Sequence, residues 1–216
     1  MPLYKTITVN STTKVLIWKI EESFEDLYNE IPLTERSLAR VRKMKSELHQ
    51  RGFLSIRHLL ASEGYTDHDL FYDENGKPHL HNGKHISITH SFIFSAIIIS
   101  DIEVGIDVEK KRAKILKIAH RFTTLDEYQK LNHTNVITRK LTIVWCVKES
   151  LYKSFNRVGL SFLKNIHVED FSLYENQTTA NVNFEDKEEE YNVWFLEFEG
   201  FSCAFSLLNE RLRDDS

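Results

Sequence analysis

Residues 86–109 read ISITHSFIFSAIIISDIEVGIDVE, and this stretch decides the fold class. It holds three short segments rich in β-branched residues, at Ile86–Thr89, Ser95–Ser100 and Val104–Glu109, which is the pattern of consecutive strands. Apolar residues at helical spacing flank it on both sides, over about residues 34–62 and 115–155. Because strands and helices do not alternate as βαβ units, the sequence predicts an α+β fold.

The two halves of the chain are similar in plan. In the first half, a strand at Lys14–Ile20 precedes a helix that Thr34 caps and that runs to about Gln50, followed by a second helix over about Gly52–Ser62. The turn-rich residues 71–85 then lead into the strands of the opening stretch. We expect one compact protein of two lobes, residues 1–102 and 103–216.

The second half repeats this order with other lengths. Helical patterns cover about Ile115–Arg121, Leu125–Leu131 and Ile137–Phe155, and alternating strands follow, such as Tyr191–Phe198 and Phe201–Leu208.

The formal net charge of −4 over 216 residues averages very unequal segments. Residues 34–60 carry 7 Lys or Arg against 2 Asp or Glu, and residues 110–164 carry 13 against 3. Residues 169–216 carry 3 against 13. Two basic blocks on a mildly acidic protein indicate a local anionic partner rather than general binding to nucleic acid.

Several classes of protein are excluded by composition. The 2 cysteines and the lack of a Cys/His ligand spacing argue against a disulfide scaffold and a zinc site. The N-terminus does not resemble a signal peptide, and the longest apolar run, Phe92–Ile99, is too short to span a membrane. We therefore expect a cytoplasmic protein with no membrane partner.

The segment Gly105-Ile106-Asp107-Val108-Glu109 is the most informative for chemistry. In a strand, Asp107 and Glu109 point to one face while Ile106 and Val108 point to the other, into the core. Two carboxylates on one face repel each other unless a cation lies between them, and Mg²⁺ binds oxygen ligands of this kind. The same pattern is also that of an exposed strand with two solvated acids.

The helix that ends near Phe155 carries the sequence WCVKESLYK at 145–153. Lys148 falls within the apolar stripe of this helix, where a lysine is unusual, and Glu149 and Lys153 are a turn apart on an adjacent face. One interpretation is a Lys148 side chain that extends to solvent beside an ordinary Glu–Lys pair. The other places Glu149 with the two strand carboxylates and directs both lysines to an anionic ligand.

Two smaller signals precede these motifs in the chain. Thr89 and His90 end a strand, and a hydroxyl, an imidazole and exposed backbone N–H groups can together bind a phosphate, although a single histidine is more often structural. Gly76-Lys77-Pro78 forms a tight turn with one cation. His79, His81 and His85 lie in the same region, and we interpret them as turn-flanking residues rather than as a metal site.

Taken in order, these segments resemble the 4′-phosphopantetheinyl transferase superfamily, in its long single-chain form with two similar lobes. The resemblance rests on Gly76-Lys77-Pro78, ISITHS at 86–91, GIDVE at 105–109 and WCVKESLYK at 145–153. His120-Arg121-Phe122, Glu127 and Gly159 add to it. It covers about residues 51–165, and Thr89 departs from the serine that is usual in the family.

The resemblance implies an α+β pseudo-dimer whose active site lies between the lobes. It implies Mg²⁺-dependent transfer of 4′-phosphopantetheine from coenzyme A to a serine of an apo carrier protein, with release of adenosine 3′,5′-bisphosphate. The carrier would serve fatty-acid, polyketide or nonribosomal peptide synthesis. It further implies roles for individual residues. The metal would be held by Asp107, Glu109 and Glu149, and coenzyme A would be bound by Arg51, Gly76, Lys77, Pro78, Thr89, His90, Asp107 and Lys153.

Chemical reasoning adds catalytic roles to this assignment. Glu149 is the first candidate to accept the proton of the carrier serine and Glu109 the second, while Lys148 or Lys153 would stabilise charge on the departing phosphate. We expect a monomer whose partners are coenzyme A and an acidic carrier, with no nucleic acid. The alternatives are a non-catalytic module that binds coenzyme A or a carrier, and another Mg²⁺-dependent enzyme acting on nucleotide pyrophosphates.

Overall fold

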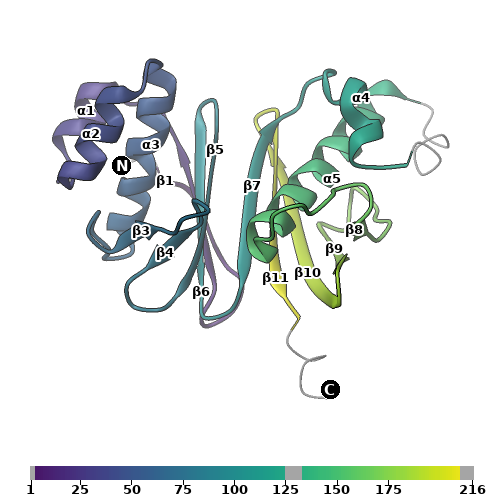
Figure 1. Cartoon of the computed structure of the whole chain (residues 1–216). Coiled ribbons are helices and arrows are strands. Elements are labelled where there is room, and N and C mark those ends of the chain that lie inside the picture. Colours follow the sequence, from purple (N-terminus) through teal and green to yellow (C-terminus); the bar gives the residue numbers. More distant parts are fainter. Residues whose placement is uncertain (1–2, 125–132, 210–216) are drawn as a thin grey trace. The chain divides into compact units, whose positions relative to one another are not determined.

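The computed structural model describes residues 3–124 and 133–209 (Figure 1). The chain divides into two compact units, Met1–Asp101 and Ile102–Ser216, each built on one antiparallel sheet with helices. This mixed architecture confirms the predicted α+β class. Within the described ranges, no helix is long and apolar enough to cross a membrane.

The first unit has a six-stranded sheet in the order β1-β2-β6-β5-β4-β3. Its strands are β1 (Leu3–Thr8), β2 (Lys14–Lys19), β3 (Leu70–Tyr72), β4 (Pro78–Leu80), β5 (His85–Ser91) and β6 (Phe94–Ser100). Its helices are α1 (Phe24–Asn29), α2 (Glu35–Lys43) and α3 (Glu47–Ser62). All three helices lie on one side of this sheet (Figure 1).

The boundary between α2 and α3 differs from the prediction of one helix to about Gln50. Thr34 caps α2 as expected, its side chain accepting from the Ser37 N–H, but the helix ends at Lys43. Met44 adopts an extended conformation, and the Gln50 side chain donates to the carbonyls of Val41 and Met44. These bonds satisfy carbonyls that the end of α2 leaves open, so a side chain of the next helix stabilises the break.

The core of the first unit forms where α3 crosses the sheet. Leu54, Leu59 and Leu60 of α3 are fully buried, and they belong to one cluster with Leu16 of β2 and Ile97 of β6. The predicted strands at 86–89 and 95–100 are both present, as β5 and β6. The sequence did not predict α1 or β1, which are short and lie at the edge of the unit.

The second unit has a five-stranded sheet in the order β7-β11-β10-β9-β8. Its strands are β7 (Val104–Lys110), β8 (Ile166–Val168), β9 (Gln177–Phe184), β10 (Lys187–Phe198) and β11 (Phe201–Leu208). Its helices are α4 (Ile115–Ile118), the 3₁₀ turn η1 (Ala119–Arg121) and α5 (Thr134–Phe155). The expected helix at 125–131 and the matched Glu127 lie outside the described residues.

The long helix α5 packs along one face of this sheet and forms the core there. Its predicted apolar stripe, which includes Leu141, Val144 and Leu151, is buried, and it shares one cluster with Val182 of β9 and Phe195 of β10. Cys146 and Cys203 are both buried thiols.

Candidate functional site

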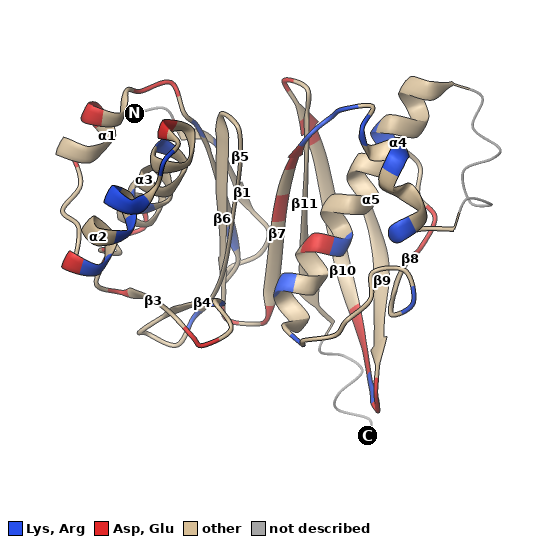
Figure 2. Cartoon of the chain, turned by 45° about the horizontal axis from the view of Figure 1, so that its top comes forward, with Lys and Arg blue, Asp and Glu red and all other residues tan. Residues whose placement is uncertain are grey.

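Strand β7 and helix α5 together present most of the charged residues that the sequence singles out. Figure 2 shows acidic residues along β7, and an acidic residue beside a basic one on α5. Asp107 is buried at 6% exposure, and Glu109 is half-buried on the same face of the strand. The face that carries Gly105, Asp107 and Glu109 is the one that meets α5, because Lys153 of α5 contacts Asp107.

Lys153 is the cation that the structure places at these carboxylates. Its ammonium group donates to Asp107 Oδ1 at 2.7 Å and to the backbone carbonyl of Ile106 at 2.9 Å. The Asp107 side chain is 8% exposed and that of Lys153 is 29% exposed, so the ion pair lies at the edge of the interior. One end of α5 is thereby tied to the middle of β7.

The remaining carboxylates have too little positive charge around them. Burial and the negative charge of Asp107 raise the pKa of Glu149 to about 7, and the charge of Glu109 adds to this, although Lys153 opposes it. Burial and the charge of Asp107 also raise the pKa of Glu109, against a hydrogen bond from Trp145 and the charges of Arg112 and Lys153. Three acids share an environment with a shortage of cations.

The charge of Asp107 acts on both Glu109 and Glu149, so the three carboxylates lie near one another. Within residues 3–124 and 133–209, no three His, Cys, Asp or Glu side chains are arranged so that they could hold a metal ion as they stand. Oxygen donors of this kind are nevertheless those that Mg²⁺ prefers, and a divalent cation would offset their mutual repulsion. The donor chemistry therefore fits such a cation.

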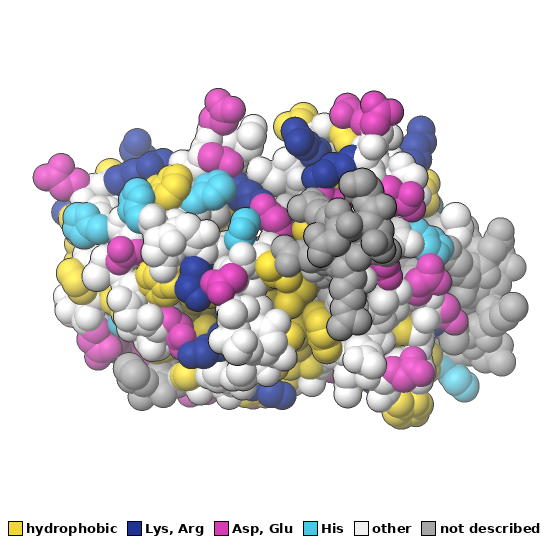
Figure 3. All heavy atoms as spheres, turned by 90° about the horizontal axis from the view of Figure 1, so that it is seen from below, with side chains coloured by type: hydrophobic (Ala, Val, Ile, Leu, Met, Phe, Trp, Pro, Cys, Tyr) yellow, Lys and Arg dark blue, Asp and Glu magenta, His cyan; other side chains and the backbone are white. Residues whose placement is uncertain are grey.

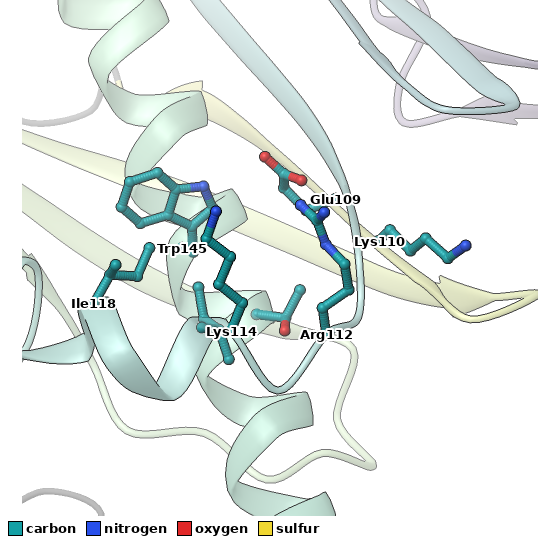
Figure 4. A pocket seen from close by; sticks show the side chains of 8 residues that line it. Glu109, Lys110, Arg112, Lys114, Ile118 and Trp145 are labelled. Carbon is teal, nitrogen blue, oxygen red and sulfur yellow. The ribbon is translucent and has the colours of Figure 1, made fainter.

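A pocket of about 180 Å³ opens beside Glu109 (Figure 4). Its lining combines cations with apolar side chains and comprises Glu109, Lys110, Arg112, Lys114, Ile115, Ile118, Thr142 and Trp145. Arg112 and Lys114 extend toward Glu109 and Trp145, whereas Lys110 points away from them (Figure 4). The sequence did not single out Trp145 or Arg112 for a role. Arg112 follows Glu109 by only three residues, whereas the closeness of Trp145 to Glu109 depends on the packing of α5 against β7.

Lys148 occupies a different environment from Lys153. It is 5% exposed, and its ammonium group donates to the carbonyls of Phe162 at 2.7 Å and Ile166 at 2.6 Å. The side chain thus links α5 to the segment that enters β8. One of the two interpretations of the sequence had the Lys148 side chain extending to solvent. In the structure it is buried instead.

In the first unit, the structure brings His90 of β5 next to the beginning of α3. The rings of His49 and His90 meet edge to face with centroids 5.9 Å apart. Gly52 lies directly against the His90 ring, because a Cβ placed on Gly52 would be 2.7 Å from His90 Cδ2. Thr89 is buried at 6% exposure, while His90 is exposed. The sequence did not indicate His49 or Gly52, since nothing local links α3 to β5.

Arg51 lies on α3 close to this histidine pair in sequence. Its Nη2 donates to the carbonyl of Ile20 at 3.3 Å. Its Nε is buried, with no hydrogen-bond partner in the described part of the chain.

The Gly76-Lys77-Pro78 segment forms the predicted turn before β4. Gly76 has a φ of 84°, a value that glycine adopts without strain, and the Lys77 N–H donates to Asp73 Oδ1 at 2.9 Å. His79 interacts with Asp73 at 3.1 Å and, with His81, stacks on Phe71. Histidine side chains gather on the first unit's part of the face seen in Figure 3. His79 contacts Asp73 of the turn, and both His79 and His81 contact Phe71.

Comparison with known proteins links the second unit to a family of known sequences. The sequence model of the 4′-phosphopantetheinyl transferase superfamily matches residues 103–206. The 4′-phosphopantetheinyl transferase gsp of Aneurinibacillus migulanus is 30% identical over 159 residues, which is 71% of this chain and 65% of that protein. Both findings support membership of the 4′-phosphopantetheinyl transferase superfamily. It spans less than two thirds of the length of the curated relative.

The match to the transferase superfamily includes all of the β7 and α5 residues described above. Asp107, Glu109, Glu149 and Lys153 fall within residues 103–206, whereas Thr89 and His90 fall outside them. The match to the superfamily model therefore lies in the unit that holds the buried carboxylates.

Proposed function

We propose that this protein transfers the 4′-phosphopantetheine group of coenzyme A to a serine hydroxyl of an apo carrier protein. The by-product would be adenosine 3′,5′-bisphosphate, and the reaction would require Mg²⁺. Membership of the superfamily supports the reaction class. The observation that carries the proposal is the group of Asp107, Glu109 and Glu149 near Lys153, beside a pocket lined with cations.

We assign the metal to the three carboxylates because the nearby cations do not offset the burial and mutual repulsion that act on Glu109 and Glu149. Asp107 is buried and already paired with Lys153, while the raised pKa values of Glu109 and Glu149 show that their charges are poorly compensated. When bound there, Mg²⁺ would supply charge neutralisation at the pyrophosphate of coenzyme A. Transfer of a phosphoryl group depends mainly on such neutralisation and on positioning.

Glu149 is our candidate for the general base. Its half-buried carboxylate lies near Asp107 and Lys153, and a carboxylate within reach of the serine hydroxyl can accept its proton, with Glu109 as the second candidate. Lys153 would stabilise negative charge on the departing bisphosphate, since its ammonium group lies at Asp107. Lys148 is engaged by two backbone carbonyls, so we assign the phosphate contact to Lys153 alone.

The residues of the first unit are proposed to bind coenzyme A. The exposed imidazole of His90 and the Thr89 hydroxyl suit phosphate oxygens, and Arg51 could meet the 3′-phosphate. Gly76, Lys77 and Pro78 would lie at the adenine end. The acidic carrier would meet the basic segment at 110–117, where complementary charge speeds association.

The test is incubation of the protein with coenzyme A, Mg²⁺ and a panel of apo carriers, followed by intact mass measurement of each carrier. We expect a phosphopantetheine adduct on at least one carrier, and none after removal of divalent cations by chelation. If the folded protein modifies no carrier, a module that only binds coenzyme A or a carrier becomes the better account. Titration calorimetry with coenzyme A then identifies it.

A further inference from the structure

Gly105 of β7 has no room for any side chain. A Cβ built on it would lie 1.8 Å from the carbonyl oxygen of Ser150, 2.6 Å from the carbonyl carbon and 3.1 Å from Cα. All three atoms belong to the backbone of α5, which cannot rotate away as a side chain can. Helix and strand therefore touch backbone to backbone at this position, an approach that only glycine allows.

This contact lies in the middle of the residues assigned to the site. Glu149 directly precedes Ser150, and Asp107 lies two residues after Gly105 on the same face of β7. One turn earlier in α5, Cys146 donates to the carbonyl of Ser202 at 3.4 Å, and one turn later Lys153 donates to Ile106 and Asp107. Contacts on both sides of Ser150 thus depend on how closely α5 approaches the sheet.

We propose that Gly105 is a positioning residue: it sets the distance between α5 and β7, and thereby holds Glu149 and Lys153 against Asp107. An ordinary contact of about 3.5 Å with Ser150 would require the two backbones to separate by roughly 1.5 Å. With the Lys153 side chain in its present conformation, such a shift would take its 2.7 Å contact with Asp107 beyond hydrogen-bonding distance. The consequence for transfer rests on the proposed function, but the effect on the ion pair does not.

The first experiment needs neither metal nor substrate. The coupling between Asp107 and Lys153 is measured from the unfolding of Asp107→Asn, Lys153→Met and the double variant, once with Gly105 and once with Gly105→Ala. We expect measurable coupling with Gly105 and its loss with Gly105→Ala. The control is Val182→Ala, a truncation in the core of the same unit that lowers stability without touching the contact at Gly105. The coupling between Asp107 and Lys153 should persist in this variant.

The substitution Asp107→Glu, which lengthens the acidic side chain, gives a second measurement of the coupling. This measurement does not require Gly105→Ala to fold. With the backbones in contact at Gly105, Asp107→Glu carries the carboxylate one methylene past its present position beside Lys153, so its coupling with Lys153 should drop in the otherwise native chain. Where Gly105→Ala does fold, the same Asp107→Glu change should restore part of the coupling, because the separated backbones then leave room. Coupling that is unchanged by Gly105→Ala, or by Asp107→Glu in the native chain, overturns the inference.

A metal titration then connects the position of α5 to the site. With Mn²⁺ as the probe, followed by electron paramagnetic resonance, we expect about tenfold weaker binding for Gly105→Ala and little change for Val182→Ala. Equal Mn²⁺ affinity in the two variants contradicts a positioning role. If the native protein binds no Mn²⁺ and modifies no carrier, the proposed function fails, and the ion-pair experiment still decides the role of Gly105.

Discussion

Both units bury acidic side chains, and they do so with opposite electrostatic results. In the first unit, Asp67 is 5% exposed and accepts hydrogen bonds from Thr34, Ser37 and Arg57 at 2.8–3.0 Å. Burial alone would raise the pKa of Asp67, but the bonds from Thr34 and Ser37 and the charge of Arg57 outweigh it and lower that pKa. This carboxylate is fully compensated.

In the second unit, the pKa values of Glu109 and Glu149 are raised, because burial and the charge of Asp107 exceed what the nearby cations offset. The contrast shows how a structural charge differs from a functional one. A fully bonded ion pair stabilises the fold and leaves no capacity for a ligand. An uncompensated group of carboxylates is costly to the fold and has capacity for a cation.

The largest expected effect would come from Asp107→Ala. It removes the acid whose charge reaches both other carboxylates, and transfer should fall by about three orders of magnitude, measured as the initial rate of adduct formation. Lys153 is partly exposed and can be solvated, so circular dichroism should show a folded protein. Normal turnover by a folded Asp107→Ala variant would remove Asp107 from the site and erase the contrast between the units.

Asp67→Ala should affect stability and not the chemistry. It leaves the Arg57 guanidinium buried without its carboxylate, and unfolding in urea should show a loss of about 3–5 kcal/mol. The rate of transfer per folded molecule should stay unchanged in conditions where the variant is folded. A loss much smaller than this would mean that the pair is less compensated than its hydrogen bonds indicate.

The pH dependence of stability sharpens the same comparison with a smaller effect. Because the pKa of Asp67 is below its ordinary value of 3.8 in the folded protein, its contribution is complete above that value. The contribution is lost as the pH falls from about 3.8 through the lower folded pKa. Urea unfolding of the native protein and of Asp67→Asn over this range should give curves whose difference shrinks toward acid. A constant difference would show that Asp67 does not titrate differently in the two states.

The smallest effect is expected at the basic segment. Lys111 already pairs with Glu197 at 3.0 Å, so the test uses Lys117→Glu, which reverses an exposed charge of the same segment outside the pocket. The KM for the carrier should rise several-fold at low salt, and kcat should change little. Lys5→Glu in the first unit makes the same change in net charge and serves as the control. Equal KM values for the two variants at low salt would mean that the segment is a solvated surface only.

Much of the second unit could be predicted because its signals are local. Alternation along 104–110 places Asp107 and Glu109 on one face, and apolar spacing identifies α5. The roles of the two lysines could not be separated in this way. Lys148 and Lys153 lie on the same helix, and Lys148 is buried only because the carbonyls of Phe162 and Ile166 come within reach of it.

The sequence by itself determined the α+β class, the strands within 86–109 and the long helix α5, and the resemblance of its motifs to one family. These follow from periodicity and from residues that are near in the chain. Only the tertiary structure decided that α5 crosses β7 at Gly105, that Lys153 pairs with Asp107 and that His90 lies on Gly52. The physical reason is that each of these contacts joins residues far apart in the chain, whose approach depends on the packing of whole elements.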